Sequence, residues 1–171
     1  INLPFAIVET EYDELKKAIE AAKQQPTPVI NRPPNSACKM TQESVEAQLK
    51  HGDEAYAELD FITAAIDYNT LHQSGVDWIP YLTGRLALVW LVQHELPEIL
   101  AESIEHASKC IRQCPLEPAS YLALALIRIS QFRYIDARKW IELAELTGAT
   151  ASAILDHVKH KYEVFLQRGT R

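Results

Sequence analysis

Glycine is scarce in this 171-residue chain, which contains only 5 of them. Folds built from many β-strands and tight turns usually need more, because glycine adopts the backbone conformations that such turns require. Alanine, leucine, glutamate, lysine and glutamine are abundant instead, and these residues have high helix propensities. The composition therefore predicts a mostly helical protein.

Long apolar runs are also lacking. The longest, Leu86–Val92, is far shorter than the roughly 18–20 residues that a membrane-spanning helix needs. No segment alternates between apolar and polar residues as a half-buried strand does. Residues 1–5 do not have the charged start and long apolar core of a signal peptide. The first residue is Ile1 rather than Met, so we expect a fragment or a processed product. Because the apolar runs are short, we expect no membrane span.

The cysteine count and the net charge restrict the setting and the partners. The three cysteines, Cys38, Cys110 and Cys114, form no regular framework. Such a pattern is typical of reduced thiols and favours a cytoplasmic location. The formal net charge of −6 is unfavourable for binding nucleic acid or anionic lipid, since both require clustered positive charge.

No residue pattern indicates an enzyme. Glycine-rich phosphate loops, nucleophile elbows and kinase-like motifs are absent from the sequence. His106, Cys110 and Cys114 follow one another at intervals of one helical turn, and such residues can bind zinc. A straight helix cannot wrap three ligands around one ion, however, and a free cysteine commonly acts as a small buried residue. We also interpret His157 and His160 as surface residues, and predict no metal site, no cofactor and no catalysis.

A proline-rich segment divides the chain. Residues 26–36 contain four prolines, which a helix cannot accommodate. Before them, residues 10–25 show the pattern of an amphipathic helix that Thr10 could cap. We therefore divide the chain into an N-terminal segment (1–25), a linker (26–40) and a helical domain (41–171). The N-terminal helix either packs outside this domain as an extra helix, which we favour, or occupies a groove of the domain as an internal plug.

The helical domain contains an internal repeat of 34 residues over 45–78, 84–117 and 118–151, with an insertion at 79–83. Small or apolar residues recur in each unit with the same spacing, and small residues allow two helices to approach closely. These residues are Gly52, Ala64, Tyr68 and Leu71 in the first unit, Leu91, Ser103, Ala107 and Cys110 in the second, and Ala125, Ala137, Ile141 and Ala144 in the third.

The spacing and the residue types resemble the tetratricopeptide repeat family. The third unit carries most of the resemblance, with Tyr121, Leu124, Ala125, Tyr134, Ala137 and Ala144 at the characteristic positions. The second unit departs from the pattern at Leu91 and Ser103. The glycine usual at the turn within each repeat is replaced by Leu59, Glu98 and Phe132. The resemblance implies an all-α fold, a right-handed superhelical stack of antiparallel helix pairs with about three repeats and a closing helix at 152–167.

This architecture offers a reason for the unusual apolarity of residues 121–130. The first helix of an internal pair lies between neighbouring helices and also lines the concave face of the stack, so it needs little polar surface. The second helix of each pair keeps a solvent-exposed side.

Similarity to this family implies a protein-interaction module, such as an adaptor, an assembly factor or a chaperone-like scaffold, whose concave groove binds a partner peptide. The residues predicted to line the groove are Leu49, Asp53, Tyr56, Leu88, Val92, Glu95, Leu122, Leu126 and Ile129. Most are apolar, so we expect an amphipathic or apolar segment as partner. Some family members hold acidic chaperone tails with basic groove residues, and we expect no such clamp here.

Alternatives to a groove that binds a partner are also compatible with the sequence. Neighbouring helices, the N-terminal helix or a second copy of the chain could bury the groove residues instead of a partner. The chain could also be a regulatory or oligomerisation domain of a larger protein or enzyme.

Overall fold

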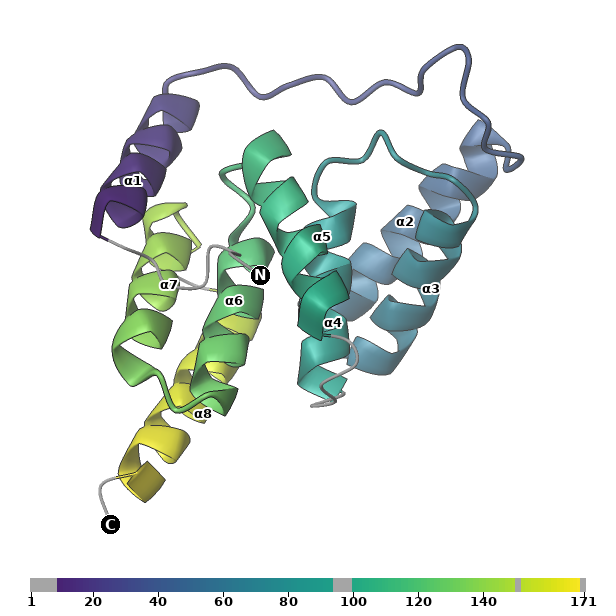
Figure 1. The fold of residues 1–171 in the computed structure, drawn as a ribbon. Helices are drawn as coiled ribbons and strands as arrows, with labels where there is room; N and C mark the ends of the chain where they lie inside the picture. Colours follow the sequence, from purple (N-terminus) through teal and green to yellow (C-terminus); the bar gives the residue numbers. More distant parts are fainter. Residues whose placement is uncertain (1–8, 94–99, 150–151, 170–171) are drawn as a thin grey trace.

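The computed structural model describes residues 9–93, 100–149 and 152–169, and within them the chain is all-α, with no strand. The helices are α1 (Glu9–Lys23), α2 (Gln42–Ala57), α3 (Phe61–Gln73), α4 (Leu82–Gln93), α5 (Leu100–Gln113), α6 (Pro118–Ser130), α7 (Tyr134–Leu146) and α8 (Ala153–Gly169) (Figure 1). The predicted all-helical class is therefore confirmed. The sequence also predicts a break between two helices at 94–97, and these residues lie outside the described part of the chain.

Local sequence signals explain where several helices begin. Thr41 caps α2, since its hydroxyl oxygen accepts a hydrogen bond from the Ser44 amide at 3.1 Å. Asp60 caps α3 in the same way, and Pro118 occupies the first turn of α6, where no amide proton is needed. Helix α1 begins at Glu9, one residue before the predicted start at Thr10.

Consecutive helices pack in pairs, and each pair packs on the next. The helices α2 and α3, α4 and α5, and α6 and α7 pack against each other (Figure 1). The first helix of a pair also packs on the preceding pair: α4 contacts α3, and α6 contacts both α4 and α5. The last helix, α8, packs on α6 and α7.

Helix α6 accordingly has four helical neighbours, and every residue from Ala119 to Ile129 is buried. The helices can approach closely where small residues face one another. A Cβ atom on Gly84 in α4 would lie 2.6 Å from Sγ of Cys110 and 3.0 Å from Oγ of Ser120. Real Cβ contacts are longer than this, so α4, α5 and α6 can meet here only because residue 84 has no side chain.

Two turns within helix pairs have the same unusual geometry. Leu59, between α2 and α3, has a φ of 62°, and Phe132, between α6 and α7, has a φ of 60°. The amide after each residue bonds five residues back, from Asp60 to Ala55 at 2.8 Å and from Arg133 to Arg128 at 2.9 Å. Such bonds end a helix through a left-handed residue, which is usually glycine. The third equivalent position, Glu98, lies outside the described residues.

The N-terminal helix packs at the far end of the stack from the helix that follows it. Helix α1 contacts α7, where the Tyr12 hydroxyl donates to Glu142 Oε2 at 2.9 Å and Ile19 is completely buried. It lies beside the last pair as an extra helix, and the exposed linker returns along one edge of the stack to α2 (Figure 1). Near the end of the linker, Arg32 donates to the carbonyl oxygens of Cys38 and Met40.

The left-handed turn at Phe132 generates a testable prediction. Phe132 is 71% exposed, so its ring contributes little burial that would compensate for the backbone strain. We expect Phe132→Gly to be more stable than Phe132→Ala by about 1 kcal/mol, because both remove the ring but only glycine avoids the left-handed penalty. Urea unfolding of the two variants measures the difference.

The matched control is Ile135, which is similarly exposed but lies in the first turn of α7. At this helical position the order must reverse, so that Ile135→Ala is more stable than Ile135→Gly. Equal stability of Phe132→Gly and Phe132→Ala would contradict the assigned strain.

Candidate functional site

The structure places most of the predicted groove residues inside the stack. Leu88, Leu122, Leu126, Ile129 and Tyr56 are buried, and Leu88 and Leu122 are completely so. Leu49, Asp53 and Val92 are partly exposed, and Glu95 lies outside the described residues. Neighbouring helices thus cover the middle of the predicted face, and α8 contributes by packing on α6. The accessible parts of the face lie towards its ends.

At one end, Leu49 and Asp53 lie in an open depression on α2. Its other lining residues are Glu46, Lys50, Glu54 and Ala57. All of them come from a single helix, so the depression has no opposing wall. Specific ligand sites are usually concave, so this depression is a poor candidate for the principal site.

Asp53 is the centre of a polar cluster rather than a free side chain. One carboxylate oxygen accepts hydrogen bonds from the Tyr68 hydroxyl at 2.6 Å and from Arg85 Nη1 at 3.0 Å. The other accepts from the Tyr81 hydroxyl at 2.7 Å. Burial, followed by these contacts with Asp53, raises the pKa of Tyr81, so its hydroxyl stays a proton donor at neutral pH. Asp53 was predicted to face a partner, and the structure gives it three internal donors.

Arg85 joins this carboxylate to a second one. Its Nε donates to Glu117 Oε1 at 2.8 Å, and its guanidinium lies 4.7 Å from the ring centre of Tyr56 and 4.3 Å from that of Tyr81. Burial alone would lower the pKa of Arg85, but the charge of Glu117 and their hydrogen bond outweigh it, so the pKa is raised. The cluster connects α2, α4 and the start of α6, which are the first helices of three consecutive pairs.

The cluster was not predicted from the sequence, although the positions of its residues carry a signal. Asp53, Arg85 and Glu117 are 32 residues apart in each case, close to the repeat length. Charges of alternating sign at nearly the repeat spacing can meet when the pairs stack. The signal is easily overlooked because Arg85 directly precedes the apolar run at 86–92.

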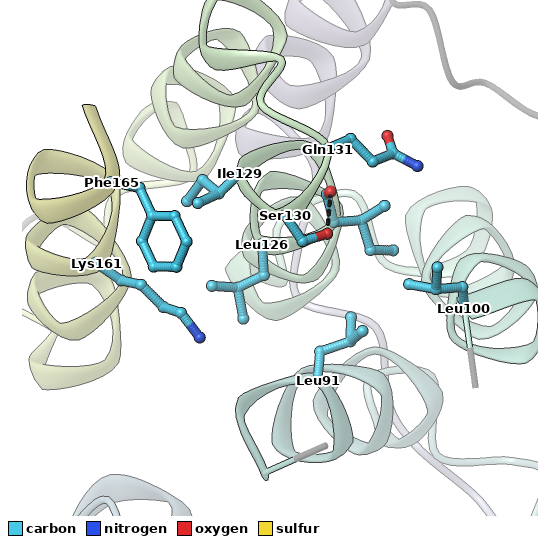
Figure 2. A pocket seen from close by; sticks show the side chains of 9 residues that line it. Leu91, Leu100, Leu126, Ile129, Ser130, Gln131, Lys161 and Phe165 are labelled. Atoms are coloured by element: carbon cyan, nitrogen blue, oxygen red, sulfur yellow. Dashed lines mark hydrogen bonds between the residues drawn. The ribbon is translucent and has the colours of Figure 1, made fainter. Parts of the chain in front are cut away.

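A more enclosed cavity lies at the other end of the face. It has a volume of about 230 Å³, and its walls come from four helices (Figure 2). Helix α4 contributes Leu91, α5 contributes Leu100, α6 contributes residues 126, 127, 129 and 130, the α6 cap contributes Gln131, and α8 contributes Lys161 and Phe165. Leu126 and Ile129, two of the predicted groove residues, are therefore brought together in this pocket.

The polar side chains around the pocket have internal partners. The Ser130 hydroxyl donates to the Ile127 carbonyl at 2.7 Å, and Gln131 Oε1 accepts from Arg128 Nη1 at 2.8 Å. Phe165 is held in place through its backbone, since its carbonyl accepts a hydrogen bond from the Tyr134 hydroxyl at 3.1 Å. What the pocket offers a ligand is mainly a fixed apolar surface.

The thiols and imidazoles considered for zinc do not converge. Cys110 is completely buried, and burial raises the pKa of its thiol to about 12, whereas zinc binds the thiolate. Within the described ranges, no three His, Cys, Asp or Glu side chains are grouped closely enough to hold a metal ion. None of the helices in the described parts of the chain is long and apolar enough to cross a membrane.

His106 packs between two other rings instead. Its imidazole meets His72 of α3 edge to face at 4.9 Å and lies 5.9 Å from Trp90 of α4. Burial and the proximity of His72 lower the pKa of His106, although Glu102, with an oxygen at 3.5 Å, acts in the opposite direction. The neutral imidazole is therefore the form that the folded protein prefers.

The buried charge pair yields a prediction about stability. Glu117 is only 8% exposed, so removing its charge leaves Arg85 with Asp53 as its one remaining carboxylate partner in a partly buried site. We expect Glu117→Gln to lower the free energy of unfolding by about 2 kcal/mol, because a buried charge-assisted hydrogen bond is lost while the Asp53 contact remains. As a control, Glu20→Gln removes an exposed partner of Lys23 and is expected to cost less than about 0.5 kcal/mol. Similar small losses in both variants would show that the cluster contributes no more than a surface ion pair.

The two histidine environments predict opposite dependences on pH. A lowered folded-state pKa at His106 means that stability is lost as the pH falls through about 6.5, so His106→Gln gains relative to wild type in acid. A raised pKa at His51, caused by its hydrogen bond with Asp67, stabilises the fold below about 6.5 and is lost as the pH rises above it. His51→Gln must therefore lose most at low pH. Thermal unfolding from about pH 5.5 to about pH 8 measures the stability of each variant relative to wild type. If both variants gain stability, or both lose it, relative to wild type as the pH falls, the two assignments are contradicted.

No family model, no curated protein and no solved structure matches the chain.

Proposed function

We propose that this chain is a protein-interaction scaffold of the tetratricopeptide type, which binds a segment of a partner protein at the pocket between α4, α5, α6 and α8. The observation that carries the proposal is the pocket itself, an apolar cavity of about 230 Å³ that includes Leu126 and Ile129 of the predicted groove. In this proposal the chain is no enzyme and acts in the cytoplasm as an adaptor, an assembly factor or a chaperone-like module.

The packing order of the helices supports the family assignment. Each first helix packs on its own partner, and α4 and α6 also pack on the preceding pair, which is how helical repeats stack. The small residues of the three units, among them Gly52, Ser103 and Ala137, are all buried at helix contacts. The left-handed turns at Leu59 and Phe132 occupy the positions where the family usually has glycine. We infer that the three pairs wind in the right-handed superhelix characteristic of such repeats.

The charged cluster supports a role as a rigid scaffold. Arg85 holds Asp53 on one side and Glu117 on the other, so α2, α4 and α6 are fixed relative to one another on the face that carries the pocket. A surface that is already ordered loses less conformational entropy when a partner binds. Rigid presentation of a preformed pocket is the mechanism that we propose.

The test uses peptides selected from a displayed random library on the intact chain. Ser130 is an exposed residue at the pocket, and Ser130→Trp is expected to weaken the selected peptides at least tenfold by filling the entrance. Thr70→Trp is the matched control, since Thr70 is also exposed on a helix and bonds back to a helix carbonyl, as Ser130 does. Its affinity for the peptides must equal that of wild type.

Isothermal titration of each peptide into the three proteins gives the affinities. The proposal fails if the library yields no saturable binder, or if the peptides bind wild type and Ser130→Trp equally well.

A further inference from the structure

We propose that the pocket receives one aromatic side chain of the partner, of phenyl to indole size, with a hydrogen-bond acceptor rather than a positive charge beside it. This inference rests on the proposed function and specifies the chemistry of the partner at that site. The volume of the pocket, the nature of its walls and the cation at its edge each contribute to the argument.

The volume sets the size of the group. An apolar cavity of about 150 Å³ in a protein can hold one benzene molecule. By proportion, the 230 Å³ of this pocket corresponds to about nine non-hydrogen atoms, which is the size of an indole ring. A whole helix or a drug-sized molecule is too large, because sites for such ligands usually exceed about 300 Å³.

The walls require the inserted group to be apolar. Leu91, Leu126, Ile127 and Ile129 are all at most 5% exposed and present only aliphatic surface. The hydroxyl of Ser130 is already engaged with a backbone carbonyl. A polar group pushed into this space would lose its hydration with little compensation, whereas an apolar ring gains by leaving water.

Phe165 favours a ring over an aliphatic chain. Its side chain stands on α8 opposite Leu126 and Ile129 and forms one wall of the pocket (Figure 2). Its backbone is tied to Tyr134 of α7, so the ring is presented by a fixed helix. Two aromatic rings in edge-to-face or offset contact attract each other beyond the effect of burial alone.

Lys161 determines which partner group can lie beside the inserted aromatic side chain. Its side chain runs next to Phe165 and directs the ammonium group towards the pocket (Figure 2). An ammonium group has three donors and can serve a further acceptor while it keeps an existing contact. A second cation at this place is repelled. The partner residue next to the aromatic one is therefore a carboxylate or another acceptor, and not Lys or Arg.

Three small probes test this chemistry on the intact chain: indole, indole-3-propionate and tryptamine. Ligand-observed NMR and isothermal titration measure their affinities. We expect saturable binding of indole, with indole-3-propionate bound at least fivefold tighter than tryptamine. Lys161→Gln must bring the ratio of these two affinities close to one without abolishing the binding of indole itself.

Two variants locate the binding. Leu126→Phe fills the pocket from inside and Ser130→Trp from its exposed edge, so each is expected to reduce indole affinity at least tenfold, while Thr70→Trp leaves it unchanged. If one filled variant does not fold, the indole affinity of the other still tests whether indole binds in the pocket. The inference is overturned if indole does not saturate, if both filled variants bind it normally, or if tryptamine binds as well as indole-3-propionate.

The probes and the peptide library can fail separately. Saturable indole binding without any selected peptide would contradict the proposed function but not the chemistry of the pocket. If the selected peptides lack an aromatic residue and the chain shows no saturable binding of indole, the inference is overturned and the scaffold function still stands.

Discussion

The enclosure of α6 is the constraint on which the rest of the structure depends. This helix contacts four others, and all of its residues from Ala119 to Ile129 are buried. A helix that is apolar on every side cannot remain in water, so α4, α5, α7 and α8 have to assemble around it. The pocket lies where that enclosure is incomplete, at the C-terminal end of α6.

Charges contribute to this assembly in a different way. Apolar contacts favour burial but are weakly directional, whereas the fork of donors on Arg85 fits its acceptors in only one arrangement. With Asp53 on α2 and Glu117 before α6, one guanidinium sets the mutual position of three helical pairs. The surrounding tyrosines make the site tolerable for charge by donating hydrogen bonds and by stacking on the cation. Specific alignment and hydrophobic burial are thus supplied by separate sets of residues.

Much of the fold could be predicted because it is encoded locally. The helical class, the proline-rich linker and the repeat follow from residues close together in the chain, and Thr41 and Pro118 mark helix starts directly. The turn residues Leu59 and Phe132 were identified by their position in the repeat, although neither is the glycine that their backbone favours. Periodicity also predicts correctly that Ala125 and Ala137 lie at helix contacts.

The candidate site was less predictable, because it depends on contacts between distant units. The repeat pattern predicts which residues line one face of the stack, but not how closely the next helix covers them. Leu88 and Leu122 are therefore buried, while Leu126 and Ile129 reach a cavity that also needs Phe165 of α8, a helix outside the repeat. Arg85 was not predicted as a site residue because it directly precedes the apolar run at 86–92, and only the stacking of the pairs brings Asp53 and Glu117 to it.

The docking of α1 on α7 changes how the array can come apart. In an open array of helical pairs, each unit touches only its neighbours, and the terminal units can fray independently. Here α1 packs on α7 and the linker runs from α1 to α2, so the two ends of the array are joined through one covalent segment. The buried Cys38 of the linker lies against Gly75, after α3, and the buried Ile19 of α1 secures the other end of the segment on α7. Local unfolding of one terminal pair therefore removes a restraint on the other, so the two ends of the array lose stability together.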